Sequence, residues 1–167
     1  MPKIIKDLKK NLKAEARRQV MEGGYESMSV RSVAKVCKVG VGTVYNYYCS
    51  KDDLIAGFLA EDWQESLERV QVVRNGSTKL KPVLETLYTE LDAFAKRFGV
   101  VFYAAKSKNP TPPRQYHESL RAQISKMILP YYPDVETADF VAESLITWSV
   151  EGRDFTVFYK IVSRLAK

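Results

Sequence analysis

The sequence predicts an all-α protein, because the same three observations recur along most of its length. Apolar residues return every three or four positions, which is the period of a helix with one buried face. Capping residues such as Ser29, Ser50 and Asp134 precede several of these stretches. No stretch alternates apolar and polar residues as a half-buried strand does. With 167 residues, 46% of them hydrophobic, the chain can bury a core in one domain or two small ones.

The first two predicted helices lie before residue 38. Residues 3–22 form an amphipathic pattern that we expect to end at Gly23 and Gly24. Its apolar positions are Ile5, Leu8, Leu12, Ala16 and Val20. Ser29 is then expected to cap a short helix that stops near Cys37, with Val30, Val33 and Ala34 on its apolar face.

A tight turn over residues 38–40 leads to the third predicted helix, over residues 41–48. We expect Val44 and Tyr48 to face the core. Ser50 followed by Asp53 matches an N-terminal capping pattern with Asp in place of the usual Glu or Gln. A long fourth helix should therefore begin there and continue to about residue 73.

The remaining chain carries four more apolar stripes. The first, from Thr78 to Phe98, tolerates Pro82 in its first turn, and Gly99 is expected to interrupt it. The apolar run over residues 100–105 is too short for its periodicity to distinguish a helix from a strand, and we expect a separate short helix there. A Pro-rich loop is predicted over residues 109–113.

After that loop, one helix should stop at Pro130 and Asp134 should cap the next. A last stripe covers residues 155–165. Gly152 either separates these final two helices or bends a single one, and the sequence leaves both alternatives open.

These elements predict two domains, residues 1–50 and residues 75–167, joined by a helix over residues 51–74. The net charge of +6 is divided unevenly between them. Residues 1–51 contain eleven Lys and Arg against four Asp and Glu, whereas the rest contains fifteen against sixteen. A basic first segment is typical of nucleic-acid binding, although a solvated charged face would give the same count.

The order of helices over residues 29–48 is that of a helix-turn-helix, whose second helix places its first residues against base edges in the major groove. Small or polar residues are needed there, because bulky apolar groups would prevent close approach. Gly42, Thr43 and Asn46 meet that requirement. The sequence therefore predicts a DNA-binding helix-turn-helix.

Three segments resemble the DNA-binding domain of the TetR family of transcriptional regulators. They are Ser29-Val-Arg-Ser-Val-Ala-Lys, Val39-Gly-Val-Gly-Thr-Val-Tyr-Asn-Tyr-Tyr and Ser50-Lys-Asp-Asp-Leu54, and the resemblance covers about residues 5–63. It implies contacts with a double-stranded DNA operator from Ser29, Arg31, Val41, Gly42, Thr43, Tyr45, Asn46, Tyr47 and Lys51. Tyr45 could instead serve core packing, or do both.

For residues 75–167 the resemblance implies a helical domain that binds a small-molecule effector and forms a homodimer through its last helices. Core packing is the first explanation of the apolar stripe that would line the pocket, and its role as a pocket wall rests on the resemblance alone. Candidate pocket residues are Leu84, Tyr88, Leu91, Phe102, Tyr103 and Trp148. Four cationic residues either contact an anionic ligand or form a solvated rim. They are Lys106, Lys108, Arg114 and Arg121.

Other functions find less support in the sequence. An enzyme would need a nucleophile, base or metal constellation, and no such set of catalytic residues is recognisable around the one histidine, His117. We expect His117 to lie at the surface and the protein to bind neither a metal nor a cofactor. Cys37 is expected to act as a small hydrophobic residue. Cys49, which precedes a helix N-terminus, is the better candidate for a reactive thiol. No apolar run reaches the ~20 residues of a membrane span, and no secretory signal is evident, so we expect a cytoplasmic protein. A ligand-independent DNA-binding dimer stays an alternative.

Overall fold

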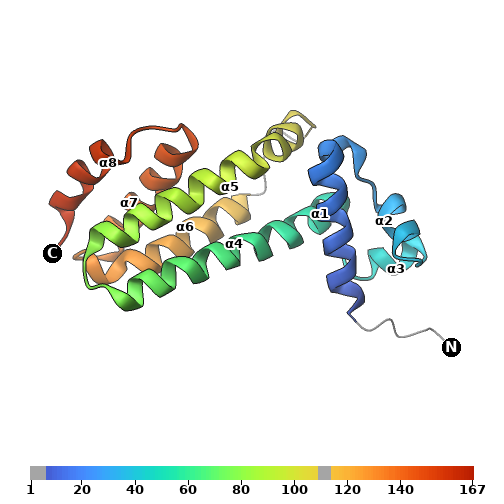
Figure 1. Cartoon of the computed structure of the whole chain (residues 1–167), viewed down its shortest axis with the longest axis horizontal. Helices are drawn as coiled ribbons and strands as arrows, with labels where there is room; N and C mark the ends of the chain where they lie inside the picture. The colour runs from blue at the N-terminus through green and yellow to red at the C-terminus, as the bar shows by residue number, and fades with distance from the viewer. Residues whose placement is uncertain (1–6, 109–113) are drawn as a thin grey trace. The chain divides into compact units, whose positions relative to one another are not determined.

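The computed structural model describes residues 7–108 and 114–167, and it gives the side chains of residues 7–99 and 117–167. Within these ranges the chain folds into the helices α1 to α8 and two short 3₁₀ helices, with no strand (Figure 1). The all-α prediction is therefore confirmed. None of the helices in these ranges combines the length and apolarity that crossing a membrane requires. Ile5 and the predicted loop over residues 109–113 lie outside the described residues.

Contacts divide the chain into two compact units. The first comprises Met1–Trp63 with Val100–Pro110, and the second comprises Gln64–Gly99 with Thr111–Lys167. The predicted domain boundaries, residues 1–50 and 75–167, stay a prediction.

Helix α1 spans Leu8–Ser27 and is broken at Gly24. Leu8, Leu12, Ala16 and Val20 are buried, as their spacing predicts. Gly24 has φ 79° and ψ 178°, a conformation that is essentially restricted to glycine. The regular helix thus breaks at the predicted glycine, but a further turn follows, so the element ends at Ser27 rather than at residue 22.

Helices α2 (Val30–Val36) and α3 (Val41–Tyr45) follow. α2 has its predicted cap and its predicted buried face. α3 is shorter than the expected 41–48, because Asn46 already ends it and the Tyr47 N–H donates back to the Val44 carbonyl in a tighter turn. Val44 and Tyr48 are nevertheless both buried, as predicted.

Helix α4 spans Lys51–Gly76 and begins with the predicted cap. The Asp53 N–H donates to Ser50 Oγ at 3.0 Å, and the Asp53 carboxylate accepts from the Cys49 N–H at 2.9 Å. The first bond satisfies a backbone donor that the first turn of a helix leaves free, and the second ties the residue before the cap to that turn.

Helix α5 spans Leu80–Lys108 as one element, so the predicted interruption at Gly99 and the separate helix over residues 100–105 are wrong. A glycine inside a helix costs about 1 kcal/mol relative to alanine. A helix of 29 residues tolerates that cost.

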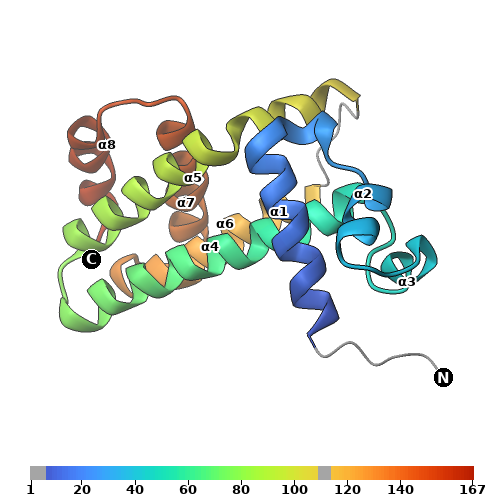
Figure 2. The ribbon, with the colours of Figure 1, turned by 45° about the vertical axis from the view of Figure 1, so that its right-hand side comes forward.

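Helix α6 (Arg114–Ile128) passes into a 3₁₀ turn over Leu129–Tyr131, so Pro130 lies inside a last tight turn rather than ending the helix outright. α7 (Val135–Val150) has the predicted Asp134 cap and lies beside α6 (Figure 2). α8 spans Phe155–Val162 and is followed by a 3₁₀ turn over Ser163–Leu165. Gly152 has φ 66°, and the last two helices are separate.

Candidate nucleic-acid interface

The helix-turn-helix is held by a small apolar core. Val30, Val33 and Ala34 of α2 are almost completely buried, and so is Val44 of α3. Tyr48 follows α3 and inserts its ring into the same unit, with its hydroxyl 3.5 Å from the Lys9 carbonyl oxygen. This anchoring fixes one face of α3 and leaves the other to solvent.

The solvent side of α3 carries most of the residues predicted to contact DNA. Gly42 and Asn46 are exposed, while Val41 and Thr43 are half-buried. Tyr45 and Tyr47 are 50% and 46% exposed, so core packing does not account for either ring. A Cβ at Gly42 would meet nothing within 4 Å, which means that the fold itself does not require glycine there.

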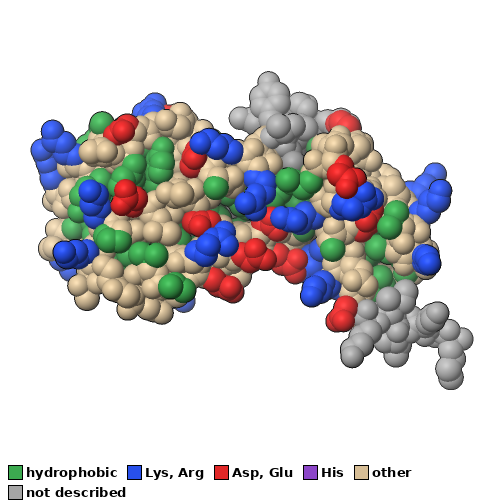
Figure 3. Space-filling view, viewed as in Figure 1, with side chains coloured by type: hydrophobic (Ala, Val, Ile, Leu, Met, Phe, Trp, Pro, Cys, Tyr) green, Lys and Arg blue, Asp and Glu red, His purple; other side chains and the backbone are tan. Residues whose placement is uncertain are grey.

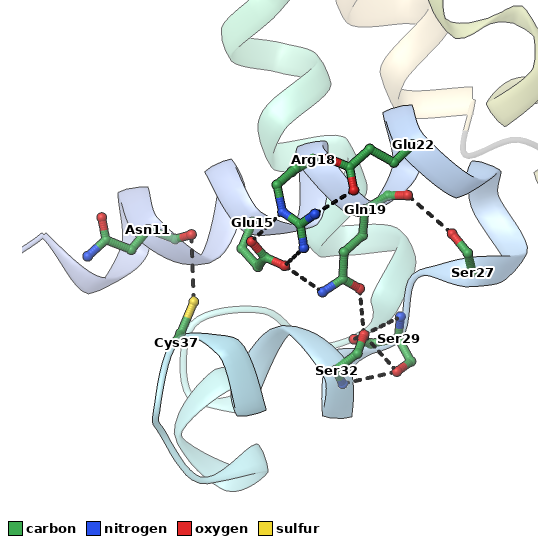
Figure 4. Close-up of polar contacts among 9 residues, drawn as sticks. All are labelled: Asn11, Glu15, Arg18, Gln19, Glu22, Ser27, Ser29, Ser32 and Cys37. Atoms are coloured by element: carbon green, nitrogen blue, oxygen red, sulfur yellow. Dashed lines mark hydrogen bonds and ion pairs between the residues drawn. The ribbon is translucent and has the colours of Figure 1, made fainter.

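Polar side chains connect α1 to the N-terminus of α2 (Figure 4). Ser29 Oγ accepts from the Ser32 N–H at 3.1 Å and the Ser29 N–H donates to Ser32 Oγ at 3.2 Å, which is a reciprocal cap. Ser32 Oγ lies 2.5 Å from Gln19 Oε1, and Gln19 in turn donates to Glu15 at 2.7 Å. The Ser29 hydroxyl therefore has a structural role in capping, and its predicted phosphate contact stays a prediction.

Arg31 is exposed on the first turn of α2, as the sequence predicts. A phosphate contact would require that exposure. The contact itself stays a prediction.

Lys51 has partners within the protein that the sequence did not predict. Its ammonium donates to the Tyr25 carbonyl oxygen at 2.5 Å and lies 4.0 Å from the centre of the Tyr25 ring. The Tyr25 hydroxyl donates to Asp52 at 2.6 Å. Burial, and then this bond to the Asp52 carboxylate, raise the pKa of Tyr25 to about 12. Lys51 thus joins the end of α1 to the start of α4, and its predicted contact with DNA stays a prediction.

Several cations of α1 are neutralised inside the same unit. Lys13 pairs with Glu61, and Arg17 makes a two-pronged contact with Asp62 at 3.1 Å. Arg18 pairs with both Glu15 and Glu22. Charged side chains of both signs are accordingly interspersed over this unit (Figure 3). The charge excess counted along residues 1–51 therefore overstates the positive charge that is free to meet phosphate.

Five exposed cations of this unit have no ion pair among the described residues. They are Lys9, Lys10, Arg31, Lys35 and Lys38. Three of the five lie in α2 or directly after it. We therefore expect the turn region of the helix-turn-helix, more than the middle of α1, to supply phosphate contacts.

Four of the candidate pocket residues belong to the second unit, and they are placed in two ways: they are Leu84, Tyr88, Leu91 and Trp148. Leu84 and Leu91 are buried. Tyr88 donates its hydroxyl to the Arg153 carbonyl at 2.5 Å, and the Trp148 indole donates to the Asp154 carbonyl at 2.8 Å. Both polar groups thus bind the loop between α7 and α8. The side chains of Phe102 and Tyr103 lie outside the described residues.

Two polar candidates of this unit, Arg121 and His117, form surface contacts. The side chains of Lys106, Lys108 and Arg114 lie outside the described residues. Arg121 contacts Asp139 at 3.0 Å. His117 is exposed, with Nε2 3.4 Å from a Glu143 oxygen. The half-buried Cys37 has its pKa raised by burial, which disfavours the reactive thiolate.

A set of large apolar side chains is exposed on α7, α8 and the turn after α8. The apolar periodicity of the sequence does not distinguish these residues from core residues, because each lies close in sequence to buried residues of the same apolar stripe. They are Val135, Phe140, Val150, Val157, Ile161 and Leu165. Exposed apolar residues grouped on adjoining elements are typical of a protein–protein interface.

Comparisons with known proteins match the segment that contains this candidate site. Residues 12–57 match the family model described as bacterial regulatory proteins, tetR family. The transcriptional repressor KstR of Rhodococcus jostii is 30% identical over 112 residues, which are 53% of this chain and 53% of KstR. The transcriptional regulator UidR of Escherichia coli K12 is 29% identical over 97 residues, 57% of this chain and 50% of UidR. The chain thus spans about half the length of the curated relatives it matches.

Solved structures share the whole fold. The multidrug binding protein EbrR, complexed with imidazole, superposes with a TM-score of 0.69 at 20% identity, over 95% of this chain and 94% of EbrR. A TetR transcription regulator from Haloarcula marismortui gives 0.61 at 23% identity, over 96% and 92% of the two chains. At these identities the likeness concerns the fold.

Proposed function

Since this chain belongs to the TetR family of transcriptional regulators, we propose that it is a homodimeric repressor, released from its operator DNA by a small-molecule effector. The observation that carries the proposal is the solvent face of α3. Together with Asn46 and Tyr47, which directly follow α3, that face combines a glycine with open space around it, an exposed amide and two exposed tyrosines, above an anchored apolar core. Such a face suits close approach to base edges.

Each exposed group on α3 has a chemistry that DNA can use. The Asn46 amide can donate to and accept from an adenine edge, and the Thr43 hydroxyl can contact either base type. The hydroxyls of Tyr45 and Tyr47 suit phosphate oxygens, which position a protein without reading sequence. Gly42 would let the backbone of α3 approach the groove.

A homodimer would place two copies of α3 in successive major grooves, about 34 Å apart. The exposed apolar residues of α7 and α8 support this part of the proposal. Val157 and Ile161, four positions apart on α8, lie on one side of that helix and are 51% and 52% exposed. A second copy of this chain would remove them from water.

The effector is proposed to bind the second unit along α5. EbrR, which shares this fold, is a multidrug binding protein and was complexed with imidazole. The bonds from Tyr88 and Trp148 to the α7–α8 loop favour a second candidate, a DNA-binding dimer that needs no ligand, because these two groups already have partners within the protein. In either case we place the protein in the cytoplasm, together with its proposed DNA operator.

Selection of bound DNA from a random double-stranded pool tests the proposal. We expect enrichment of a site with two related half-sites. Asn46→Ala and Thr43→Ala should each relax the preference at one base position by about 1–3 kcal/mol. Arg31→Ala should weaken all sequences alike. Equal, sequence-blind losses for all three variants would contradict direct reading by α3.

The two candidates differ in a second experiment. Bound operator is challenged with a panel of small molecules, and release is followed by fluorescence anisotropy. A molecule that releases the DNA and also raises the melting temperature of the free protein supports the effector-controlled repressor. Release by no member of a chemically broad panel favours the ligand-independent dimer.

A further inference from the structure

The turn between α2 and α3 holds an exposed lysine in a backbone conformation that favours glycine. Lys38 has φ 56°, in the left-handed region. Two hydrogen bonds close the end of α2 around it: the Lys38 N–H donates to the Lys35 carbonyl at 3.2 Å and the Val39 N–H to the Ala34 carbonyl at 3.0 Å. These bonds define a helix end in which glycine is the usual residue. Lysine at this position is therefore strained, because its Cβ crowds the backbone.

No hydrogen bond or ion pair of the Lys38 side chain with the described residues offsets that strain. The residue is exposed, and the structure gives its ammonium no ion pair or hydrogen bond among the described residues. A cation near a helix C-terminus gains some free energy from the helix dipole, but Lys35 already occupies the last turn of α2. Strain that a fold does not need is commonly retained for a function.

The position of Lys38 indicates which function this is. It lies two residues before Gly40, which caps the N-terminus of α3. Lys35, Gly40 and Gly42 around it are also exposed, and none of them carries a negative charge. The lysine thus stands on a cationic turn directly before the helix proposed to enter the major groove.

We infer that Lys38 binds a phosphate of the operator backbone and that this contact is the reason for a strained lysine in the turn. The inference rests on the proposed function as a DNA-binding protein. A lysine ammonium is a compact charge on a flexible stem, so it suits a phosphate oxygen without demanding one geometry. The contact would add affinity for every sequence and no base preference.

The test is a substitution with opposite effects on stability and on DNA binding. Lys38→Gly removes the strain together with the charge, and we expect the melting temperature of the free protein to rise by about 2–4 °C. Affinity for the selected operator should fall by roughly tenfold at 0.1 M salt for each subunit bound. The slope of log affinity against log salt should decrease by about one per subunit.

Two further variants separate charge from backbone. Lys38→Arg keeps the charge and the strain, so both the affinity and the melting temperature should stay at the wild-type values. Lys38→Asn removes the charge but tolerates the left-handed conformation, so it should lose affinity and salt dependence as Lys38→Gly does.

Lys126→Gly is the matched control, because Lys126 is exposed in the last turn of α6, an ordinary helical position. It should lower the melting temperature, since glycine is a poor helix residue, and leave operator binding unchanged. If Lys38→Gly binds the operator with wild-type affinity and salt slope, the inference is wrong while the proposed function stands. If the wild-type chain enriches no DNA sequence, the proposed function fails, and the inference fails with it.

Discussion

α3 and the α7–α8 pair both expose side chains to solvent, but the two sets differ in chemistry. α3 and the two residues after it expose a glycine, an amide and two tyrosines whose hydroxyls are available for hydrogen bonds. The α7–α8 pair exposes only aliphatic groups and Phe140 among its large apolar residues. Polar groups over a rigid core suit a hydrated, charged partner such as DNA. Exposed apolar groups are unfavourable in water, and covering them with another apolar surface lowers the free energy. Exposure alone thus does not identify a partner, but exposure together with chemistry does.

The largest effect is expected on α8. Ile161→Asp places a carboxylate among the exposed apolar residues, and burying it in an interface would be costly. We expect the dimer dissociation constant to rise at least about 100-fold, or about 2.7 kcal/mol, measured by sedimentation equilibrium. Ala122→Asp, an equally exposed position on α6, is the control and should leave association unchanged. A dimer as tight as the wild type for Ile161→Asp would contradict an interface on α8.

On α3 the sharpest substitution is Gly42→Ala. It should weaken operator binding about tenfold or more, because a methyl group would hold the helix away from the bases, and fluorescence anisotropy measures this. The unfolding free energy should stay equal or rise by a few tenths of a kcal/mol, since the new Cβ meets nothing. Gly99→Ala, also in open space inside a helix, should stabilise the protein without any change in DNA binding. Equal DNA affinity for both variants would show that α3 does not approach DNA closely at Gly42.

The contact between Tyr25 and Asp52 joins α1 to α4 within the first unit, and its strength depends on pH. Tyr25→Phe should lower the unfolding free energy by about 1.5 kcal/mol, because a hydrogen bond to a carboxylate is lost. The pKa of Tyr25 is raised in the folded protein to about 12. Its contribution is therefore fully present below the ordinary tyrosine pKa of about 10 and is lost as pH rises toward 12. Urea unfolding between pH 9 and 12 should show that loss in the wild type, and a smaller loss in Tyr25→Phe.

The smallest effect is expected at the loop between α7 and α8. Tyr88→Phe removes the bond to the Arg153 carbonyl and should cost about 0.5–1 kcal/mol. Hydrogen exchange should show faster opening of the amides in residues 151–154. Tyr159→Phe, on the neighbouring helix α8, is the comparison and should leave these rates unchanged. If Tyr88→Phe instead alters only the response to an effector, Tyr88 belongs to the ligand site.

Features that depend on neighbouring residues were predicted well. Ser29 and Asp134 cap the helices expected of them, and Val44 and Tyr48 are buried at the predicted positions. A cap acts within one turn, so a few residues suffice to specify it. The errors lie where local signals conflict with a longer element: Gly99 is a helix breaker by type, yet α5 continues through it.

The sequence by itself determined the helical class, the helix-turn-helix and the family signature, because periodicity, capping and short motifs depend only on residues that are close in sequence. Only the tertiary structure decided which cations are already engaged within the protein. Lys13 and Arg17 meet Glu61 and Asp62 across more than forty residues of chain, and Lys51 meets the Tyr25 carbonyl. No local pattern encodes such pairs, since they form only when α1 packs against α4. The same reason applies to Lys38, whose charge is visible in the sequence but whose left-handed backbone appears only in the folded turn.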